Sequence, residues 1–226
     1  MKIRLVIATR ATEADFFTTT ATGRSLAFNL PSFIDLRLFP ENREGLPAIY
    51  NRVIRESASD PAILIFAHDD IHILDFYWCR RIFEGLSAFQ IIGAAGNLRR
   101  LPGQPAWGFV DTQFTWDDRK YLSGIVGHGN SYPPKNFSVY GPPQQKVKLL
   151  DGLLLACESE TLIQNDLFFD ERFSFHFYDL DFCRQAEMLD ISCGTWDLSL
   201  IHESGGNFST TAWRQAYATY IDKWRE

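Results

Sequence analysis

The segment His68-Asp69-Asp70 places three potential metal ligands directly after a continuously apolar stretch, residues 62–67 (AILIFA). A short apolar run of this kind predicts a buried strand. Ligands of open α/β sheets bind at the carboxyl ends of such strands, and carboxylate oxygens suit Mg²⁺ or Mn²⁺ shared with a diphosphate. The segment therefore indicates a metal site for a phosphorylated ligand. The alternative is that Asp69 and Asp70 cap a helix that follows.

A second segment, residues 168–183 (FFDERFSFHFYDLDFC), concentrates polar groups among aromatic residues. Burying carboxylates without partners is costly, so we expect some of these groups to be functional. An apolar wall raises the pKa of a nearby carboxyl group and suits it to act as a general base toward a hydroxyl. The alternative is that an aspartate caps the helix that begins there. The polar residues concerned are Asp170, Glu171, His176, Asp179 and Asp181.

His202 follows an apolar stretch and precedes residues 203–206 (ESGG), which predict a flexible turn. A lone histidine is more often structural. Together with His68-Asp69-Asp70, however, it is a candidate for a third metal ligand.

The elements that must position these residues alternate as in an α/β fold. Residues 101–145, rich in Pro, Gly and aromatic residues, predict short antiparallel strands and loops that form a wall on the acceptor side. We expect strands over 3–8, 32–39, 62–67, 89–95, 147–157 and 191–200, helices over 46–54, 76–86 and 180–189, a helical turn over 160–165 and a closing C-terminal helix.

Length and composition fit one globular domain of 226 residues. A net charge of −6 argues against binding to nucleic acid or anionic membranes. No run approaches the roughly 20 apolar residues of a membrane span, and the N-terminus lacks a signal-peptide pattern, so we expect a cytoplasmic protein. The cysteines have neither zinc-site nor disulfide-scaffold spacing and are expected to be free: Cys79, Cys157, Cys183 and Cys193.

The order of five segments resembles the GT-A nucleotide-sugar glycosyltransferases. Within that class the similarity is to the family 2-like branch, typified by streptomycin-biosynthesis-type and bacterial surface-polysaccharide transferases. The resemblance implies an α/β GT-A fold with a single Rossmann-like mixed sheet flanked by helices and a small antiparallel acceptor-side subregion. Residues 1–100 would bind the nucleotide sugar, and residues 101–226 would form the acceptor-side and catalytic half. The segments are IRLVIATR, HDDI, LLDGLLLACESETL, FFDERFSFHFYDLDFCRQAEMLD and IHESGG.

The resemblance also implies roles for particular residues. His68-Asp69-Asp70 looks like the DxD element of the class, with His in place of the first Asp. Asp70 and His202 would then bind Mn²⁺ or Mg²⁺, and His68 and Asp69 would contact the donor. Tyr178 stands where the class has the Glu of its catalytic acidic pair, which leaves Asp179 as the candidate base.

Further positions match the donor-binding parts of the class less specifically. Asp151 and Gly152 resemble the loop that holds the donor sugar and the acceptor. Thr9, Arg10 and Asn51 lie where the nucleoside would bind. A plain helix-surface role is the alternative for Asn51.

The implied activity is metal-dependent, inverting transfer of a sugar from a nucleoside-diphosphate sugar to a carbohydrate or other hydroxyl acceptor, in polysaccharide or glycoconjugate synthesis. One alternative is a non-catalytic relative that binds only a nucleotide sugar or carbohydrate. A nucleotidyltransferase is disfavoured because the loop after residues 3–8 has no glycine run. A metal hydrolase using His68, Asp69, Asp70 and His202 would need more ligands than are evident.

Overall fold

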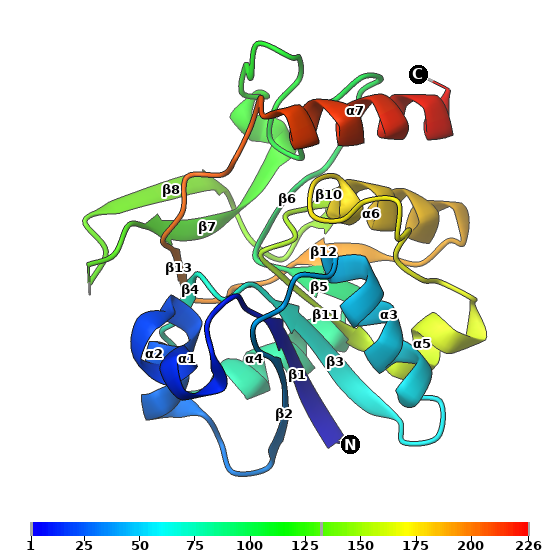
Figure 1. Cartoon of the computed structure of the whole chain (residues 1–226). Helices are drawn as coiled ribbons and strands as arrows, with labels where there is room; N and C mark the ends of the chain where they lie inside the picture. The colour runs from blue at the N-terminus through cyan, green and yellow to red at the C-terminus, as the bar shows by residue number, and fades with distance from the viewer. Residues whose placement is uncertain (1, 132, 226) are drawn as a thin grey trace.

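The computed structural model describes residues 2–131 and 133–225 (Figure 1). Up to residue 100 the elements are β1 (Lys2–Ala8), α1 (Glu13–Thr19), α2 (Ala21–Asn29), β2 (Ile34–Phe39), α3 (Leu46–Glu56), β3 (Ala62–Ala67), β4 (Ile71–Ile73), α4 (Trp78–Leu86), β5 (Ile91–Gly93) and β6 (Ala95–Asn97). They are followed by the 3₁₀ helix η1 (Arg119–Tyr121), β7 (Leu122–His128), β8 (Asn136–Gly141), β9 (Lys146–Val147), β10 (Leu149–Leu150), β11 (Leu154–Glu158), α5 (Ser159–Gln164), α6 (Tyr178–Met188), β12 (Cys193–Thr195), β13 (Leu200–His202) and α7 (Thr211–Trp224). The predicted α/β class is confirmed.

The larger sheet has the strand order β2-β1-β3-β11-β5-β12-β9. β1 pairs parallel with β2 and β3, whereas β11 is inserted antiparallel between β3 and β5. All six residues of β3 are buried, which explains its continuously apolar sequence. The sheet is mixed and flanked by helices, as predicted.

A second sheet has the order β10-β6-β7-β13-β4, with β8 paired to β7. The chain passes from one sheet to the other at Ala94, between β5 and β6, and at Lys148, between β9 and β10. The expected strands over 89–95 and 147–157 are each divided for this reason. The prediction of one mixed sheet therefore describes the larger sheet, and the remaining strands form a more extensive layer than the small subregion that was expected.

Helices cover both faces of the larger sheet (Figure 1). The ring of Tyr50, in α3, lies 4.6 Å from the ring of Phe66, in β3. Through the cross-strand pairs, Phe66 shares its face with Gly93 of β5, so the neighbouring Ile92 points to the other face. Gly85 of α4 packs directly against Ile92. α3 and α4 therefore lie on opposite faces. Among the described residues, no helix has both the length and the apolar character needed to cross a membrane.

Two short helices fill the region that the sequence predicted only as a polar loop after the first strand. The side chain of Thr12 caps α1 and that of Thr20 caps α2, each accepting from a backbone N–H three residues later. The two helices approach so closely that a Cβ on Gly23 would lie 1.9 Å from the Phe16 carbonyl oxygen. Their threonine-rich sequence has no long apolar periodicity, which is why the pattern did not reveal them.

Candidate functional site

Strand pairing brings the two predicted metal-binding segments together. The turn 68–70 connects β3 to β4. β13 runs antiparallel beside β4, with His202 opposite Ile71, and the Glu203 backbone N–H donates to the Asp70 carbonyl at 2.9 Å. Because the turn leads into a strand, the helix-capping alternative for its two aspartates is wrong.

The side chains of His68, Asp70 and His202 converge at this point. One ligand atom from each lies within 4.8 Å of the other two. His68 Nδ1 is 3.8 Å from Asp70 Oδ1, and His202 Nε2 is 3.3 Å from Asp70 Oδ2. Two imidazole nitrogens and a carboxylate are a suitable donor set for a divalent ion such as Mn²⁺. The structure thus gathers both predicted ligands and adds His68, which was expected to contact the donor.

The hydrogen bonds around Tyr178 test whether these residues fit a metal. The Tyr178 hydroxyl donates to the Gly152 carbonyl at 2.7 Å, so it accepts the 2.9 Å hydrogen bond from His68 Nε2–H. This pattern assigns the lone pair of His68 to Nδ1, which faces Asp70. Asp70 Oδ1 is buried and has no hydrogen-bond partner among the described residues. His68 Nδ1 and Asp70 Oδ1 are thus two acceptor atoms that face each other without a proton between them. Such a pair fits a bound cation.

The electrostatics of the three residues agree with that fit. Burial lowers the pKa of His68, although the neighbouring Asp70 opposes this effect. Burial alone would raise the pKa of Asp70, but the hydrogen bonds from His202 and Ser204 and the charges of His202 and His68 together outweigh burial, and the pKa falls to about 2. For His202 burial lowers the pKa, and the Asp70 carboxylate outweighs burial so that the net pKa is raised. At neutral pH the site therefore holds an ionised carboxylate beside a neutral His68.

Asp179 lies in the first turn of α6, with its carboxylate against the loop 151–152. The Gly152 N–H donates to Asp179 Oδ2 at 3.0 Å, and the Leu180 N–H donates to Oδ1 at 2.9 Å. Burial raises the pKa of Asp179 to about 7, and the nearby Asp151 carboxylate adds to the rise. A side chain at position 152 would collide with Tyr178, since a Cβ there would lie 2.4 Å from its hydroxyl oxygen. Asp151, Gly152 and Asp179 are thus brought together.

Asp181 belongs to a different network, although it is only two residues further along α6. It is fully buried and accepts hydrogen bonds from Lys223 at 2.8 Å and Trp224 at 2.9 Å. The N-cap of α6 is Phe177, in a left-handed conformation, so neither Asp179 nor Asp181 is the N-cap residue. Asp179 nevertheless accepts the first-turn N–H of Leu180, whereas Asp181 makes no such bond among the described residues.

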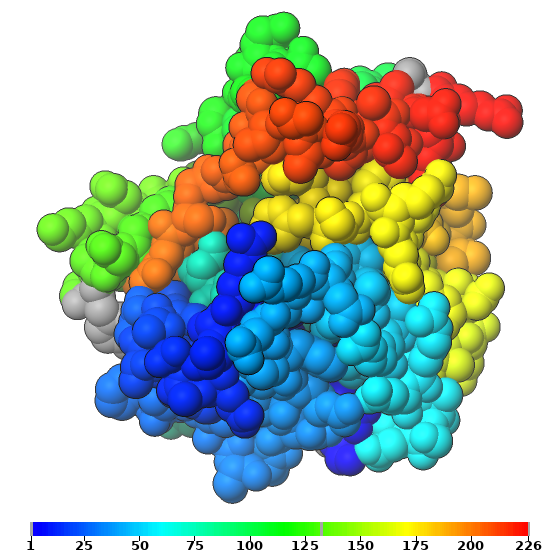
Figure 2. All heavy atoms as spheres, in the orientation of Figure 1, coloured from blue at the N-terminus to red at the C-terminus, as the bar shows by residue number. Residues whose placement is uncertain are grey.

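The candidate metal-binding triad (His68, Asp70 and His202) and Asp179 line one cavity of about 360 Å³. In Figure 2 the orange segment that follows β13 passes over the surface between α7 and the blue N-terminal part of the chain. His128 and Ser138 also line the cavity and lie 2.8 Å apart, from Nε2 to Oγ. The sequence analysis missed both. The alternating polar positions 136, 138 and 140 of β8 were the signal that could have found this face.

The remaining predicted donor residues lie outside the cavity lining, as far as the described residues show. The Thr9 hydroxyl donates to Asp69 at 2.6 Å and so joins the carboxyl ends of β1 and β3. Arg10 follows and is exposed. Asn51 is buried, and its amide bonds the backbone of Phe169 in both directions, at 2.8 and 2.9 Å. The helix-surface alternative for Asn51 is therefore wrong.

No known protein-family model matches the sequence, and no curated protein matches it. Among solved structures the chain is similar to A197 from STIV, with a TM-score of 0.47 and 11% identity over 88% of this chain and 82% of that one. It is also similar to S. aureus TarS, with a TM-score of 0.48 and 11% identity over 90% of this chain and 37% of TarS. A structure of TarS 1–349 in complex with UDP gives a TM-score of 0.44 and 12% identity over 89% and 60% of the two chains. The chain thus spans less than two thirds of the length of each TarS structure.

Proposed function

We propose that this protein is a metal-dependent glycosyltransferase that moves a sugar from a nucleoside-diphosphate sugar to an acceptor hydroxyl, with inversion, in polysaccharide or glycoconjugate synthesis. The observation that carries the proposal is one cavity with two complementary chemistries. On one part of its wall the side chains of His68, Asp70 and His202 converge, and Asp70 Oδ1 is buried without a hydrogen-bond partner among the described residues. On another part lies Asp179, whose pKa is raised to about 7 by burial.

His68 Nδ1, the Asp70 carboxylate and His202 Nε2 would hold Mn²⁺ or Mg²⁺. Such an ion neutralises charge on a diphosphate group. We propose that Asp69, Arg10 and the loop 151–152 also contact the nucleotide-sugar donor. Thr9 would support Asp69 through the hydrogen bond from its hydroxyl to the Asp69 carboxylate. Asn51 would act indirectly, because its amide holds the backbone of Phe169.

Asp179 would act as the general base. Its carboxylate takes the proton of the acceptor hydroxyl while the acceptor oxygen forms a bond to the anomeric carbon. The bond from that carbon to the diphosphate oxygen breaks, and the nucleoside diphosphate leaves with the electron pair. Two backbone N–H groups fix the carboxylate in place at 3.0 and 2.9 Å, so the base needs no reorientation before it accepts the proton.

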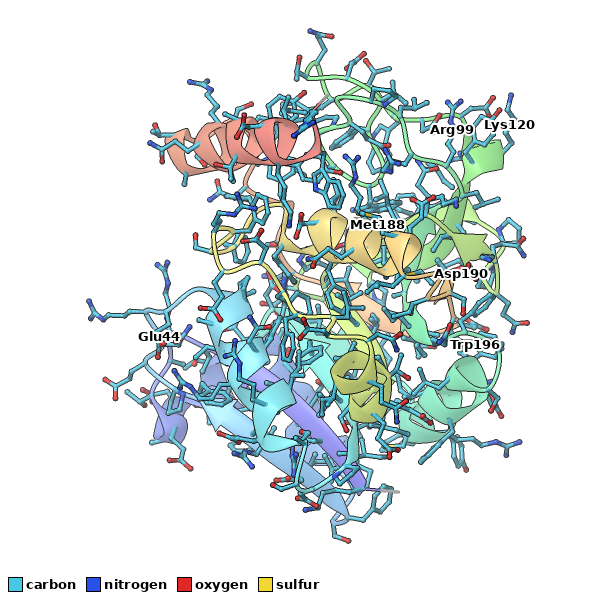
Figure 3. All side chains as sticks on the ribbon, turned by 90° about the vertical axis from the view of Figure 1, so that its right-hand side faces the viewer. Glu44, Arg99, Lys120, Met188, Asp190 and Trp196 are labelled. Atoms are coloured by element: carbon cyan, nitrogen blue, oxygen red, sulfur yellow. The ribbon has the colours of Figure 1, made fainter. Side chains whose placement is uncertain are left out.

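The first test is calorimetric titration with a panel of nucleoside diphosphates and nucleotide sugars, with Mn²⁺ present and then chelated. We expect one nucleotide to bind, and chelation to weaken that binding. Asp70→Ala should abolish the metal-dependent part. Asp179→Asn should bind the nucleotide normally and lose transfer by two or more orders of magnitude. Asp190→Asn, at an exposed position after α6 that is labelled in Figure 3, is the control and should do neither.

The pH dependence of transfer adds a second readout. Because the base must be ionised and its pKa is about 7, the rate should rise with pH and level off above about 7. Wild-type transfer by both Asp70→Ala and Asp179→Asn would contradict the proposal. Metal-dependent nucleotide binding without transfer to any acceptor would favour the non-catalytic alternative.

A further inference from the structure

A wall of aromatic rings forms another part of the cavity, away from the atoms assigned to the metal. Trp107, Trp116 and Tyr140 all line the cavity. The ring centroids of Trp107 and Tyr140 are 4.8 Å apart and those of Trp116 and Tyr140 are 5.5 Å apart. Trp107 is buried, whereas Trp116 is 51% exposed. Trp116 thus leaves apolar surface uncovered at the wall of the cavity.

The aromatic wall is connected directly to the proposed base. The Trp107 indole N–H donates to Asp151 Oδ2 at 2.8 Å, and the next residue, Gly152, donates its N–H to Asp179 at 3.0 Å. The ring of Trp116 lies 6.0 Å from that of Trp107. Trp116 and Asp179 line the same cavity, so a molecule resting on Trp116 would share that cavity with the proposed base.

The rim of the wall is polar. Asn136, Ser138 and Tyr140 alternate along β8 with Phe137 and Val139, which are exposed on its other face. Ser138 Oγ lies 2.8 Å from Nε2 of His128, which also lines the cavity. Aromatic faces edged by a hydroxyl and an imidazole suit a ligand that has an apolar C–H face and hydroxyl groups at its edge. A pyranose ring has both, whereas an alkyl chain has only the first.

We propose that Trp116, backed by Trp107 and Tyr140, is the acceptor subsite and that the acceptor is a pyranoside. The sugar ring stacks on the Trp116 indole, its hydroxyls reach Ser138 and His128, and the reacting hydroxyl points to Asp179. This inference rests on the proposed function, because the proton transfer to Asp179 belongs to that reaction. It goes further by naming the acceptor class and the residues that select it.

The Trp116 indole packs directly against Gly108, whose lack of a side chain leaves room for the ring. This contact gives a second way to test the subsite. A Cβ at position 108 would lie 2.5 Å from Cζ3 of Trp116, so Gly108→Ala must move the indole. That substitution leaves every aromatic residue of the wall present. Loss of acceptor binding in this variant would show that the position of the indole matters as well as its presence.

The experiment measures tryptophan fluorescence and sugar-proton saturation transfer with a panel of methyl pyranosides and disaccharides. Mn²⁺ and whichever nucleoside diphosphate binds are present throughout. We expect at least one pyranoside to bind, Trp116→Ala and Gly108→Ala to weaken it about tenfold or more, and Trp116→Phe to retain most of the affinity. Phe137→Ala, on the opposite face of β8, is the matched control and should bind normally. Nucleotide affinity should be the same in all five proteins.

The outcomes separate this subsite from the proposed activity. Nucleotide binding together with no pyranoside binding, or with equal pyranoside binding by Trp116→Ala, would overturn the subsite and leave the transferase proposal standing. Pyranoside binding that depends on Trp116, without any nucleotide binding, would support the subsite and contradict sugar transfer.

Discussion

The Tyr178 hydroxyl joins the proposed metal site to the loop that contacts Asp179, the proposed base. It donates to the Gly152 carbonyl and accepts from His68 Nε2. The ring is 2% exposed, and burial raises the pKa of the phenol well above its usual value, so the hydroxyl keeps its proton. Tyr178 thus selects the His68 tautomer whose Nδ1 faces Asp70, as a hydrogen-bond partner of a metal-ligating histidine does.

Tyr178→Phe should therefore weaken Mn²⁺ binding by about tenfold or more. The ring stays in the core, but His68 Nε2 loses its acceptor and the Gly152 carbonyl loses its donor. Calorimetric titration with Mn²⁺ alone measures this affinity. Tyr140→Phe, which removes a cavity hydroxyl that does not contact His68, is the control. Equal Mn²⁺ affinity in the two variants would show that Tyr178 does not position the ligand.

At the residue scale, sequence reasoning could find those groups that have a local signal. Asp70, Asp179 and His202 each stand beside an apolar strand or an aromatic segment, and the structure places all three in one cavity. The Trp107 bond to Asp151 joins residues 44 positions apart. No local pattern encodes such a contact, because it depends on how the two sheets meet.

At the element scale, the turn between β3 and β4 is held by the helix α2. The Thr22 hydroxyl lies 2.7 Å from the carbonyls of both His68 and Ile71, and the Thr22 N–H donates to the Asp69 carbonyl at 3.0 Å. Thr22 is completely buried. The position of the turn that carries His68 and Asp70 therefore depends on a helix that contributes no residue to the proposed metal site.

Thr22→Val keeps the shape of the side chain and removes the hydroxyl. Buried carbonyls of the turn would lose their donor, which should cost about 1 to 3 kcal/mol of unfolding free energy and should also weaken Mn²⁺ binding. Urea denaturation and calorimetry measure the two effects. Thr18→Val, at an exposed position of α1 where the hydroxyl donates to the Asp15 carbonyl of the same helix, should leave both values nearly unchanged. Weaker Mn²⁺ binding in Thr18→Val as well would show that the effect is not specific to the turn.

Elements with a single strong pattern were predictable, and those set by tertiary pairing were not. Residues 62–67 form β3 as expected. A continuously apolar run is typical of a strand that is covered on both faces of a sheet, and the pattern is therefore visible in the sequence. β4 escaped prediction because its sequence, IHI, is too short to show a period, and its pairing with β13 holds it in place. Residues 191–200 gave two strands, because the chain leaves the larger sheet after Thr195.

On the scale of the whole molecule, a buried ion pair joins α7 to α6. Lys223 Nζ bonds Asp181 at 2.8 Å and Asp170 at 2.7 Å, while the Asp181 side chain is 0% exposed. Burial raises the pKa of Asp181 even though Lys223 opposes the rise. The ring of Trp213, in α7, meets that of Phe114 edge to face, with the ring centroids 5.5 Å apart, so the same helix supports the loop that carries Trp116.

Lys223→Met should lower the unfolding free energy by about 3 kcal/mol at neutral pH, because the substitution leaves the Asp181 carboxylate buried without its cation. The pKa of Asp181 is already raised, and losing Lys223 raises it further. The loss should therefore be largest above that pKa, where the carboxylate is charged, and should shrink as the pH falls and Asp181 takes up a proton. Lys120→Met is the matched control. Lys120, labelled in Figure 3, is 63% exposed and pairs with Asp118, and solvent screens such a surface ion pair so that its loss should cost little stability. Urea denaturation of both variants at several pH values measures the difference. Equal losses in the two variants, or a loss in Lys223→Met that does not change with pH, would mean that the buried pair does not hold α7 against the rest of the molecule.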